Sequence, residues 1–218
     1  MRHSFSLFVL MFLEVHFLST GGHASKPKQE NLQAALNYME ENATEGIYRQ
    51  SGRHDIEKKY LAKLKKHSFK IKKFKPIDLF ALATAVKQYV LVSEFIKYEL
   101  FDSCLEAAKE DISKIAGETQ FGRFMVRDLL PSLETAKKPL FKQIFKHLHH
   151  LLFKSNMTKM DAMNLGIVFG PNFFPARASP DNENFRAADL AQFQTPFNEF
   201  VEKAILTYPL WDSLGKQL

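Results

Sequence analysis

One cysteine, Cys104, stands in the 218-residue sequence, and a single thiol excludes any disulfide within the chain. Because Cys104 lies in a stretch with apolar helical periodicity, we expect a buried thiol, with a cysteine nucleophile as the alternative. A glycine-rich phosphate-binding loop is absent from the sequence, so the chain has no common nucleotide-binding motif. Three histidines, His147, His149 and His150, share one expected helix, but the sequence pattern supplies no carboxylate or cysteine to complete a zinc site.

Alternating apolar and polar residues, the pattern of a half-buried strand, are also missing, and no internal repeat is present. Apolar residues recur instead at helical spacing. Hydrophobic residues make up 45% of the chain and include 21 phenylalanines among the aromatic ones. The sequence therefore predicts an all-α fold with one aromatic-rich core, in which Pro76 begins a helix and Asp161 caps another. The expected helices cover residues 31–41, 55–66, 76–91, 99–114, 121–133, 139–154, 161–170 and 194–207.

The first 24 residues differ from the rest of the chain. A short basic start is followed by an apolar stretch, Ser4–Leu18, and then by small residues up to Ala24. This layout is typical of a cleaved secretory signal peptide; an uncleaved anchor and a soluble amphipathic helix are the alternatives. The expected organisation is a signal peptide over residues 1–24, a polar lead-in over 25–30, one domain over 31–210 and a C-terminal tail over 211–218.

The chain carries a formal net charge of +6, and seven lysines fall between Lys63 and Lys75. Such a basic segment can steer the protein toward an acidic protein face or an anionic membrane surface, or it is simply a solvated loop. Nucleic acid is not expected as a partner, because the sequence lacks a recognition-helix signature and an interleaved set of stacking aromatics.

The segment Gly46–Gly52, with the sequence Gly-Ile-Tyr-Arg-Gln-Ser-Gly, follows the first expected helix of the domain. Glycines at both ends allow a tight and reproducible loop, which can present Arg49 to a partner. The arginine side chain offers five donors in a planar fork that suits phosphate oxygens. Taken by itself, the pattern also fits an ordinary surface arginine in a turn.

The segment Asn164–Asn172, with the sequence Asn-Leu-Gly-Ile-Val-Phe-Gly-Pro-Asn, predicts a tightly packed helix that ends at its Gly-Pro pair. Asn164 and Asn172 bracket an apolar turn, so each is expected to bind backbone or a partner, although a purely structural cap is an equal alternative. Lys87 lies on the helix after the lysine-rich segment, where a solvated helix face is the simpler interpretation.

Together, residues 44–52 and 160–172 resemble the arginine-finger loop and a late helix of the Rho GTPase-activating (RhoGAP) domain family, in the family's order and at about its spacing. The resemblance covers roughly residues 31–208. It implies a RhoGAP-like all-α helical bundle that speeds GTP hydrolysis on Rho, Rac and Cdc42-type GTPases. It also implies that the activator needs no cofactor of its own, since GTP and Mg²⁺ belong to the partner GTPase.

The resemblance further implies a role for each candidate residue. Arg49 matches the finger that enters the nucleotide site of the GTPase. Lys87 matches a lysine that supports the finger loop and contacts the GTPase. Asn172 matches the asparagine that helps to organise the finger and the GTPase switch region, and Asn164 matches a second asparagine with a more structural role.

One departure from the family concerns the segment after Lys87, which is about two residues shorter than usual. The arginine that usually follows the lysine by four residues, and that supports GTPase binding, is replaced by Leu91. Retention of the finger arginine favours an activator, whereas Leu91 favours a rival function, a module that binds and sequesters a Rho-family GTPase without activating it. A basic structural or membrane-surface protein would explain the lysines but neither motif.

A signal peptide in front of this domain makes the chain similar to the secreted RhoGAP virulence factors of parasitoid wasp venoms, which act inside host cells. We therefore expect secretion, followed by action in the cytosol of a target cell. Asn42 and Asn156 each begin an Asn-X-Thr sequence and are glycosylation acceptors in a secreted chain. A glycan on Asn42 would lie close to the finger and obstruct docking.

Overall fold

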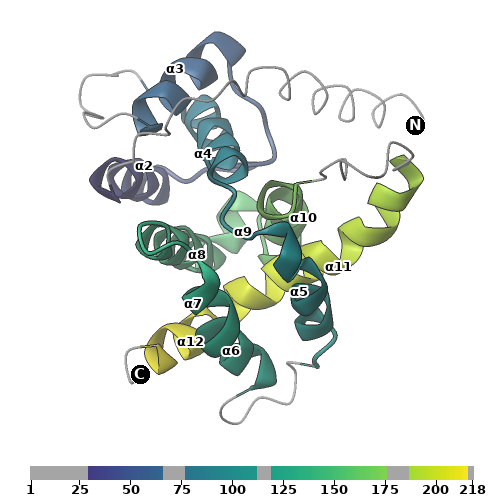
Figure 1. The fold of residues 1–218 in the computed structure, drawn as a ribbon. Helices are drawn as coiled ribbons and strands as arrows, with labels where there is room; N and C mark the ends of the chain where they lie inside the picture. Colours follow the sequence, from purple (N-terminus) through teal and green to yellow (C-terminus); the bar gives the residue numbers. More distant parts are fainter. Residues whose placement is uncertain (1–28, 66–76, 112–118, 176–186, 216–218) are drawn as a thin grey trace.

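In the computed structural model, residues 29–65, 77–111, 119–175 and 187–215 are described, with the side chains of residue 29 and residues 187–193 excepted. Every regular element within these ranges is a helix, which confirms the predicted all-α fold (Figure 1). The predicted signal peptide, residues 1–24, and most of the lysine-rich segment, residues 66–75, lie outside them.

The helices form a bundle in which α11 crosses the molecule diagonally and leads into α12 (Figure 1). Helix α10 packs along α11, and α3 packs along α4. The elements are α2 (Gln29–Glu41), α3 (His54–Lys65), α4 (Leu79–Ser93), a 3₁₀ turn (Tyr98–Leu100), α5 (Phe101–Ala108), α6 (Gln120–Phe124), a π turn (Met125–Leu129), α7 (Leu130–Ser132), α8 (Lys138–Leu152), α9 (Ser155–Thr158), α10 (Ala162–Phe173), α11 (Ala187–Leu206) and α12 (Tyr208–Leu214).

Capping side chains fix the starts of two helices near the candidate site. Asp161 accepts a 2.8 Å hydrogen bond from the backbone amide of Asn164, which confirms its predicted role as the N-cap of α10. Asp78 accepts a 2.9 Å bond from the amide of Ala81 and caps α4 in the same way. The predicted start of this helix at residue 76 is therefore wrong, because the Asp78 carboxylate satisfies an amide of a first turn that begins at Leu79.

Helix α10 also ends later than the sequence predicts. It continues through Pro171 to Phe173 instead of stopping at the Gly-Pro pair. A proline within the last turn removes one backbone donor. The burial of Phe173 in the core offsets that loss, since tertiary packing contributes most of the stability of a helix in a protein.

The bundle extends beyond the boundary expected at residue 210. Helix α12 covers Tyr208–Leu214, and the side chain of Trp211 is completely buried. The indole nitrogen of Trp211 donates a 3.0 Å hydrogen bond to the carbonyl of Ala204 on α11, which ties the two helices together. Residues 211–214 thus belong to the packed domain.

Aromatic side chains from several helices meet in the core. Phe145 of α8 stacks on Phe173 of α10 with the ring centroids 4.9 Å apart, and Trp211 meets Phe145 edge-on at 5.9 Å. Cys104 of α5 is fully buried, as predicted, and burial raises the pKa of its thiol. A buried thiol that resists ionisation is a structural residue and a poor nucleophile.

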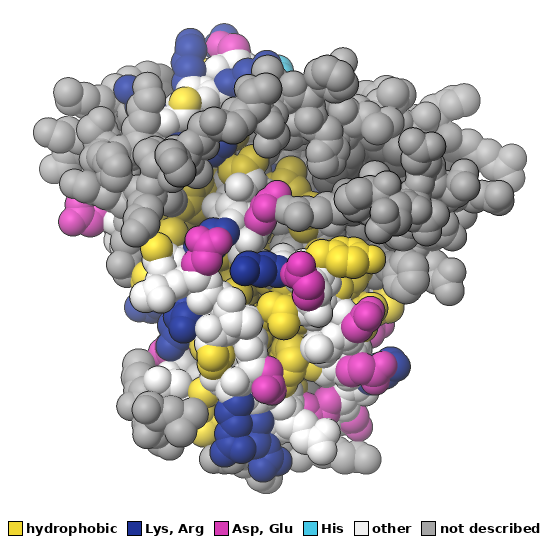
Figure 2. All heavy atoms as spheres, viewed as in Figure 1, with side chains coloured by type: hydrophobic (Ala, Val, Ile, Leu, Met, Phe, Trp, Pro, Cys, Tyr) yellow, Lys and Arg dark blue, Asp and Glu magenta, His cyan; other side chains and the backbone are white. Residues whose placement is uncertain are grey.

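Charged side chains of both signs are intermixed on the face drawn in Figure 2, with hydrophobic side chains between them. Among the helices that the structure describes, none is by itself long and apolar enough to cross a bilayer. Helix α4 and the segment Tyr98–Ala108 together are long and apolar enough for a membrane span, but a 90° bend separates them.

Candidate functional site

The loop between α2 and α3 carries Arg49 and is closed by its own backbone. The amides of Arg49 and Gln50 both donate to the carbonyl of Gly46 at 2.9 Å. The amide of Gly46 donates in turn to the carbonyl of Thr158, also at 2.9 Å, which anchors the loop on the end of α9. Gly46 has a φ of 76°, a left-handed conformation that glycine adopts without strain. The predicted tight turn is therefore present at Gly46, the first glycine of the loop.

Buried side chains separate the inner side of this loop from its outer side. Ile47 and Tyr48 are fully buried, and the Tyr48 ring meets Phe169 of α10 edge-on at 4.8 Å. Arg49 and Gln50 are exposed. Within the described residues the Arg49 side chain has no hydrogen bond or ion pair, so the loop is fixed while its arginine points to solvent, available to a partner.

Lys87 of α4 lies directly under this loop. Its amino group donates a 2.7 Å hydrogen bond to the carbonyl of Tyr48, and the side chain is half-buried, not spread on a solvated helix face. Burial lowers the pKa of Lys87, and the nearby buried carboxylate of Glu57 opposes that shift. Lys87 thus holds the peptide bond next to Arg49 with a charge-assisted hydrogen bond, the stronger class of such bonds.

The second glycine of the loop is required by a close approach to α4. A Cβ atom at Gly52 would overlap the backbone of Ala81 in the first turn of that helix. The same turn is capped by Asp78, whose own amide donates to the Tyr60 hydroxyl at 3.3 Å. The exit of the loop is therefore packed tightly against the helix that carries Lys87.

Asn164 supports the other anchor of the loop. It is half-buried in the first turn of α10, and its side-chain amide lies 3.5 Å from the carbonyl of Lys159. Lys159 has a φ of 56° and follows Thr158, whose carbonyl binds Gly46. Asn164 thus stabilises the turn on which the loop rests.

Asn172 is placed differently. Its side-chain amide donates a 2.7 Å hydrogen bond to the carbonyl of Val168, one turn back on α10. No hydrogen bond in the described part of the chain joins Asn172 to Arg49 or Lys87. Because Asn172 follows Phe169 by three residues, it lies near the part of α10 that supports Tyr48. The structure thus joins Lys87 to the loop directly and leaves Asn172 on a neighbouring helix turn.

Sequence reasoning missed the partner of His147. The Tyr48 hydroxyl lies 2.8 Å from Nε2 of His147, and Nδ1 of His147 lies 2.9 Å from Oε1 of Glu40. A second histidine, His150, lies 3.2 Å from the other carboxylate oxygen of Glu40. The sequence pattern does not indicate Glu40 as the hydrogen-bond partner of these two histidines. The available signal was the position of His147 in the apolar stripe of its helix, since a buried histidine needs partners.

Two further predictions concern metals and glycans. Among the described residues, no group of three histidine, cysteine or carboxylate side chains is arranged to hold a metal ion. Asn42 is exposed, and its side-chain amide donates a 2.9 Å hydrogen bond to the carbonyl of Tyr38 near the end of α2. Asn156 is exposed as well, but Thr158 of its Asn-X-Thr sequence is fully buried.

Comparison with known proteins gives a consistent result. A family model for the RhoGAP domain matches residues 30–178. Rho GTPase-activating protein 15 of Mus musculus is 27% identical over 167 residues, which is 72% of this chain and 31% of that protein. Rho GTPase-activating protein 68F of Drosophila melanogaster is 29% identical over 141 residues, 62% of this chain and 27% of that protein. The chain spans less than a third of the length of these relatives.

Solved structures share the fold. The BH domain from GRAF, the GTPase regulator associated with focal adhesion kinase, has a TM-score of 0.63 and 18% identity, with 84% of this chain and 94% of that chain covered. Human Rho GTPase activating protein 15 has a TM-score of 0.64 and 21% identity, with 81% of this chain and 80% of that chain covered. The helical arrangement of this chain is therefore that of known RhoGAP and BH domains.

Proposed function

We propose that this chain, which belongs to the RhoGAP family, accelerates GTP hydrolysis by a Rho-family GTPase. The relatives are named as Rho GTPase-activating proteins. The resemblance of residues 44–52 to the family's arginine-finger loop supports a finger at Arg49. The observation that carries the proposal is the contrast at Arg49. Its backbone is fixed by Gly46 and by Lys87 under Tyr48, while its side chain is exposed and unpaired among the described residues.

In this mechanism Arg49 acts on a nucleotide held by the partner. Its guanidinium enters the GTPase site beside the GTP phosphates, and its planar fork of donors stabilises the charge that develops as the phosphoryl group transfers. GTP and Mg²⁺ belong to the GTPase, so the activator supplies position and charge and no bound group. A loop fixed before docking matters here, because ordering the finger then costs less of the docking free energy.

A single-turnover GTP hydrolysis assay across Rho, Rac and Cdc42 tests this proposal. Arg49→Ala should remove most of the stimulated rate, by about 10³-fold or more, and leave binding to the GTP-bound GTPase largely intact, because the finger meets charge that exists only in the transition state. Arg49→Lys should also fail, since an ammonium group cannot reproduce the planar fork.

Arg53→Ala is the matched control for these variants. Arg53 is an exposed arginine of the same connection between α2 and α3, and it pairs with Asp55 at 3.3 Å. Its removal deletes the same charge from the same surface and should leave the stimulated rate within about twofold of wild type, as expected for an exposed ion pair. Equal hydrolysis by Arg49→Ala and wild type would contradict a finger at Arg49.

The rival function is sequestration, and Leu91 is the observation that favours it. Leu91 is half-buried in the last turn of α4, four residues after Lys87, where the family's usual arginine would aid GTPase binding. A sequestering module would bind the GTP-bound GTPase and block its effectors without speeding hydrolysis. Wild-type protein that binds tightly in the same assay and leaves the intrinsic rate unchanged would favour this function.

Secretion through the segment 1–24 is part of the proposal, with action in the cytosol of a target cell. The relatives named above come from mouse and fly, so the likeness to venom RhoGAPs stays a prediction from the sequence. Sequencing the N-terminus of the secreted protein checks it, and a mature form that begins at Met1 would contradict cleavage. Enzymatic removal of glycans from the same sample shows whether Asn42 or Asn156 is modified.

The lysine-rich segment is proposed to tighten association with an acidic GTPase face or an anionic membrane. Its support is the seven lysines between Lys63 and Lys75, of which Lys63 and Lys65 belong to α3. Replacing Lys72, Lys73 and Lys75 by Gln should weaken binding to both at low salt, and the difference should shrink near physiological salt, where the Debye length is about 8 Å. Unchanged binding at low salt would mean that the segment is merely solvated.

A further inference from the structure

Tyr48, the residue before the candidate finger, is held at both of its ends. Its carbonyl accepts from Lys87, and its hydroxyl lies 2.8 Å from Nε2 of His147 on α8. His147 continues the connection to α2, because its Nδ1 lies 2.9 Å from the Glu40 carboxylate. The loop, α8 and α2 are thus joined by two consecutive hydrogen bonds between residues far apart in the sequence.

The direction of these hydrogen bonds follows from the donors available. An ionised carboxylate only accepts, so Nδ1 of His147 carries the proton that it donates to Glu40. In the neutral imidazole, Nε2 is then a bare acceptor, and the Tyr48 hydroxyl donates to it. Burial lowers the pKa of His147 and raises that of Tyr48 well above its usual value, which keeps the imidazole neutral and the phenol protonated.

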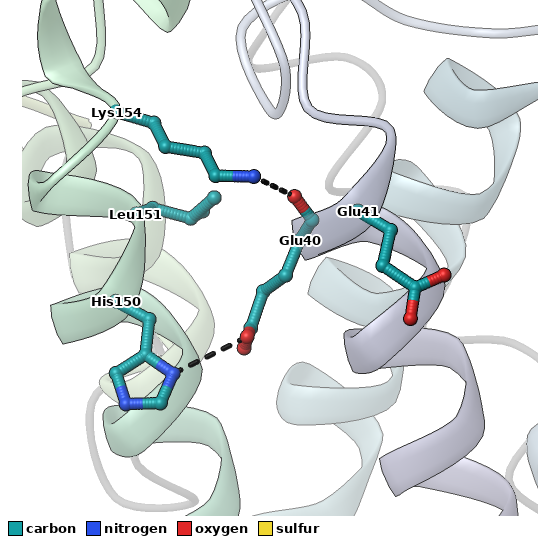
Figure 3. A pocket seen from close by; sticks show the side chains of 5 residues that line it. All are labelled: Glu40, Glu41, His150, Leu151 and Lys154. Carbon is teal, nitrogen blue, oxygen red and sulfur yellow. Dashed lines mark hydrogen bonds and ion pairs between the residues drawn. The ribbon is translucent and has the colours of Figure 1, made fainter.

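Glu40 is itself held in place at the surface end of this chain of bonds. Figure 3 shows Glu40 of α2 reaching across to α8, with its carboxylate toward His150 and its backbone carbonyl toward Lys154, while Glu41 points away. Burial alone would raise the pKa of Glu40, but its hydrogen bonds to His147 and His150 outweigh that effect and lower the pKa overall. Glu40 therefore remains an ionised acceptor near neutral pH.

Tyr48 needs such support because of its backbone. Its φ of 69° lies in the left-handed region, which residues other than glycine rarely adopt. A residue keeps this strained backbone conformation only where several surrounding contacts hold it in place. Relaxation of Tyr48 would move the next residue, Arg49, and a displacement of about 1 Å at a reacting centre can cost on the order of 100-fold in rate.

We propose that Glu40 and His147 are positioning residues for the arginine-bearing loop, acting on Arg49 through the Tyr48 hydroxyl. This inference rests on the proposed function. Neither residue touches the GTPase in this mechanism. Both set the conformation in which the finger is presented.

Two variants break the connection at different points. Tyr48→Phe removes one oxygen atom and keeps the ring against Phe169, while His147→Leu removes both hydrogen bonds of the imidazole. At saturating protein, each should lower the single-turnover rate of GTP hydrolysis by about tenfold to a hundredfold. The Kd for the GTPase bound to a non-hydrolysable GTP analogue should stay within about threefold, since binding spreads over a larger surface.

His147→Gln and a double variant separate positioning from packing. The amide that His147→Gln introduces can donate a hydrogen toward Glu40 and accept from Tyr48, so this variant should retain more of the rate than His147→Leu. The double variant Tyr48→Phe, His147→Leu should hydrolyse GTP no more slowly than the slower of the two single variants, because both substitutions remove the same connection. A double variant with multiplied losses would contradict a shared path.

His149→Leu is the control on the same helix. The Nδ1 atom of His149 lies 2.9 Å from the carbonyl of Ile205 on α11, away from the loop, so the substitution should leave the stimulated rate at the wild-type value. The thermal melting temperature of every variant is measured in parallel. If His147→Leu does not fold, Tyr48→Phe decides, because it removes only the hydroxyl.

Amide hydrogen exchange in the free protein, followed by NMR, tests the inference independently of any GTPase. In Tyr48→Phe and His147→Leu, the amides of Arg49 and Gln50 should exchange about tenfold faster than in wild type, and in His149→Leu they should not. Wild type that fails to stimulate hydrolysis overturns the proposed function alone, and the exchange rates then decide the inference. The inference is overturned if both amides exchange at the wild-type rate in Tyr48→Phe and His147→Leu. It is also overturned if both variants stimulate hydrolysis at the wild-type rate.

Discussion

The side-chain amino group of Lys87 donates a 2.7 Å hydrogen bond to the backbone carbonyl of Tyr48, the residue that precedes Arg49. A lysine on one helix thus determines how the peptide bond before the candidate finger is oriented. Because Lys87 is half-buried and close to Glu57, its charge is held in place by packing and by an opposite charge. This relationship explains how a residue can affect the finger without taking part in the chemistry.

Replacing Lys87 by Met should reduce the stimulated rate of GTP hydrolysis. The variant keeps most of the apolar stem but leaves the Tyr48 carbonyl without its charged donor, a loss of about 1.5–3 kcal/mol, or roughly tenfold to a hundredfold in rate. Single-turnover hydrolysis measures the effect, with Kd measured alongside it, and both are expected to worsen. Lys142→Met is the control, because Lys142 is 29% exposed and pairs with Asp212 at 3.2 Å instead of the loop. Equal losses in the two variants would attribute the effect to general destabilisation.

Gly52→Ala should destabilise the fold. A Cβ atom at this position would overlap the backbone nitrogen and Cα of Ala81, and a backbone cannot move aside as cheaply as a side chain. Overpacking of this kind costs typically about 1–3 kcal/mol in the free energy of unfolding, which urea denaturation measures. Ser51→Ala, at the exposed neighbouring position, should change the free energy by less than about 0.5 kcal/mol. A Gly52→Ala variant as stable as wild type would mean that the loop exit is not packed against α4.

Local features of the site were predictable from the sequence, because they depend on neighbouring residues. Asp161 caps α10 through an amide three residues away, and the glycine at position 46 reports a tight turn. The pairing of Glu40 with His147 spans 107 positions, so no periodicity or motif indicates it. Only the packing of α2 against α8 brings the two side chains together.

Helix ends were harder to predict than helix faces for a related reason. Pro171 signals a stop by its local chemistry, yet α10 continues because Phe173 packs against Phe141 and Phe145 of α8. Trp211 gives the opposite case, since a helix of only seven residues has little local signal, and burial of the indole makes it part of the fold. In both cases tertiary packing determines where the helix ends, and local sequence patterns indicate such packing only indirectly.

The free energy of unfolding should fall as the pH drops from about 7 to 5, in part because of His147. Burial lowers its pKa in the folded state below the ordinary 6.5, so the unfolded chain takes up a proton in a range where the folded chain does not. Stability therefore rises with pH through this window and is lost as the pH falls. Glu40 has a lowered pKa as well, and its contribution is lost only below about pH 4.5, outside the window.

His147→Gln tests this assignment, because glutamine keeps hydrogen-bonding groups and cannot titrate. Its unfolding free energy, measured by urea denaturation at pH 5, 6 and 7, should depend less steeply on pH than that of wild type. The destabilisation caused by the substitution should thus shrink toward pH 5. Parallel pH dependences for the two proteins would show that His147 does not contribute to the slope.

Leu91→Arg should tighten binding to the GTP-bound GTPase. The side chain lies four residues after Lys87 on α4, so the two are neighbours on the helix surface. The resemblance to the RhoGAP family assigns a GTPase-binding arginine to this position. One new charge-assisted hydrogen bond of about 1.5 kcal/mol would lower Kd roughly tenfold. Val92→Arg adds the same charge at the exposed adjacent position, about 100° around the helix, and controls for long-range attraction. If Leu91→Arg binds no tighter than Val92→Arg, the gain is one of net charge. If it binds tighter and also raises the hydrolysis rate at subsaturating protein, the weak point of the natural sequence is docking and the finger itself is intact.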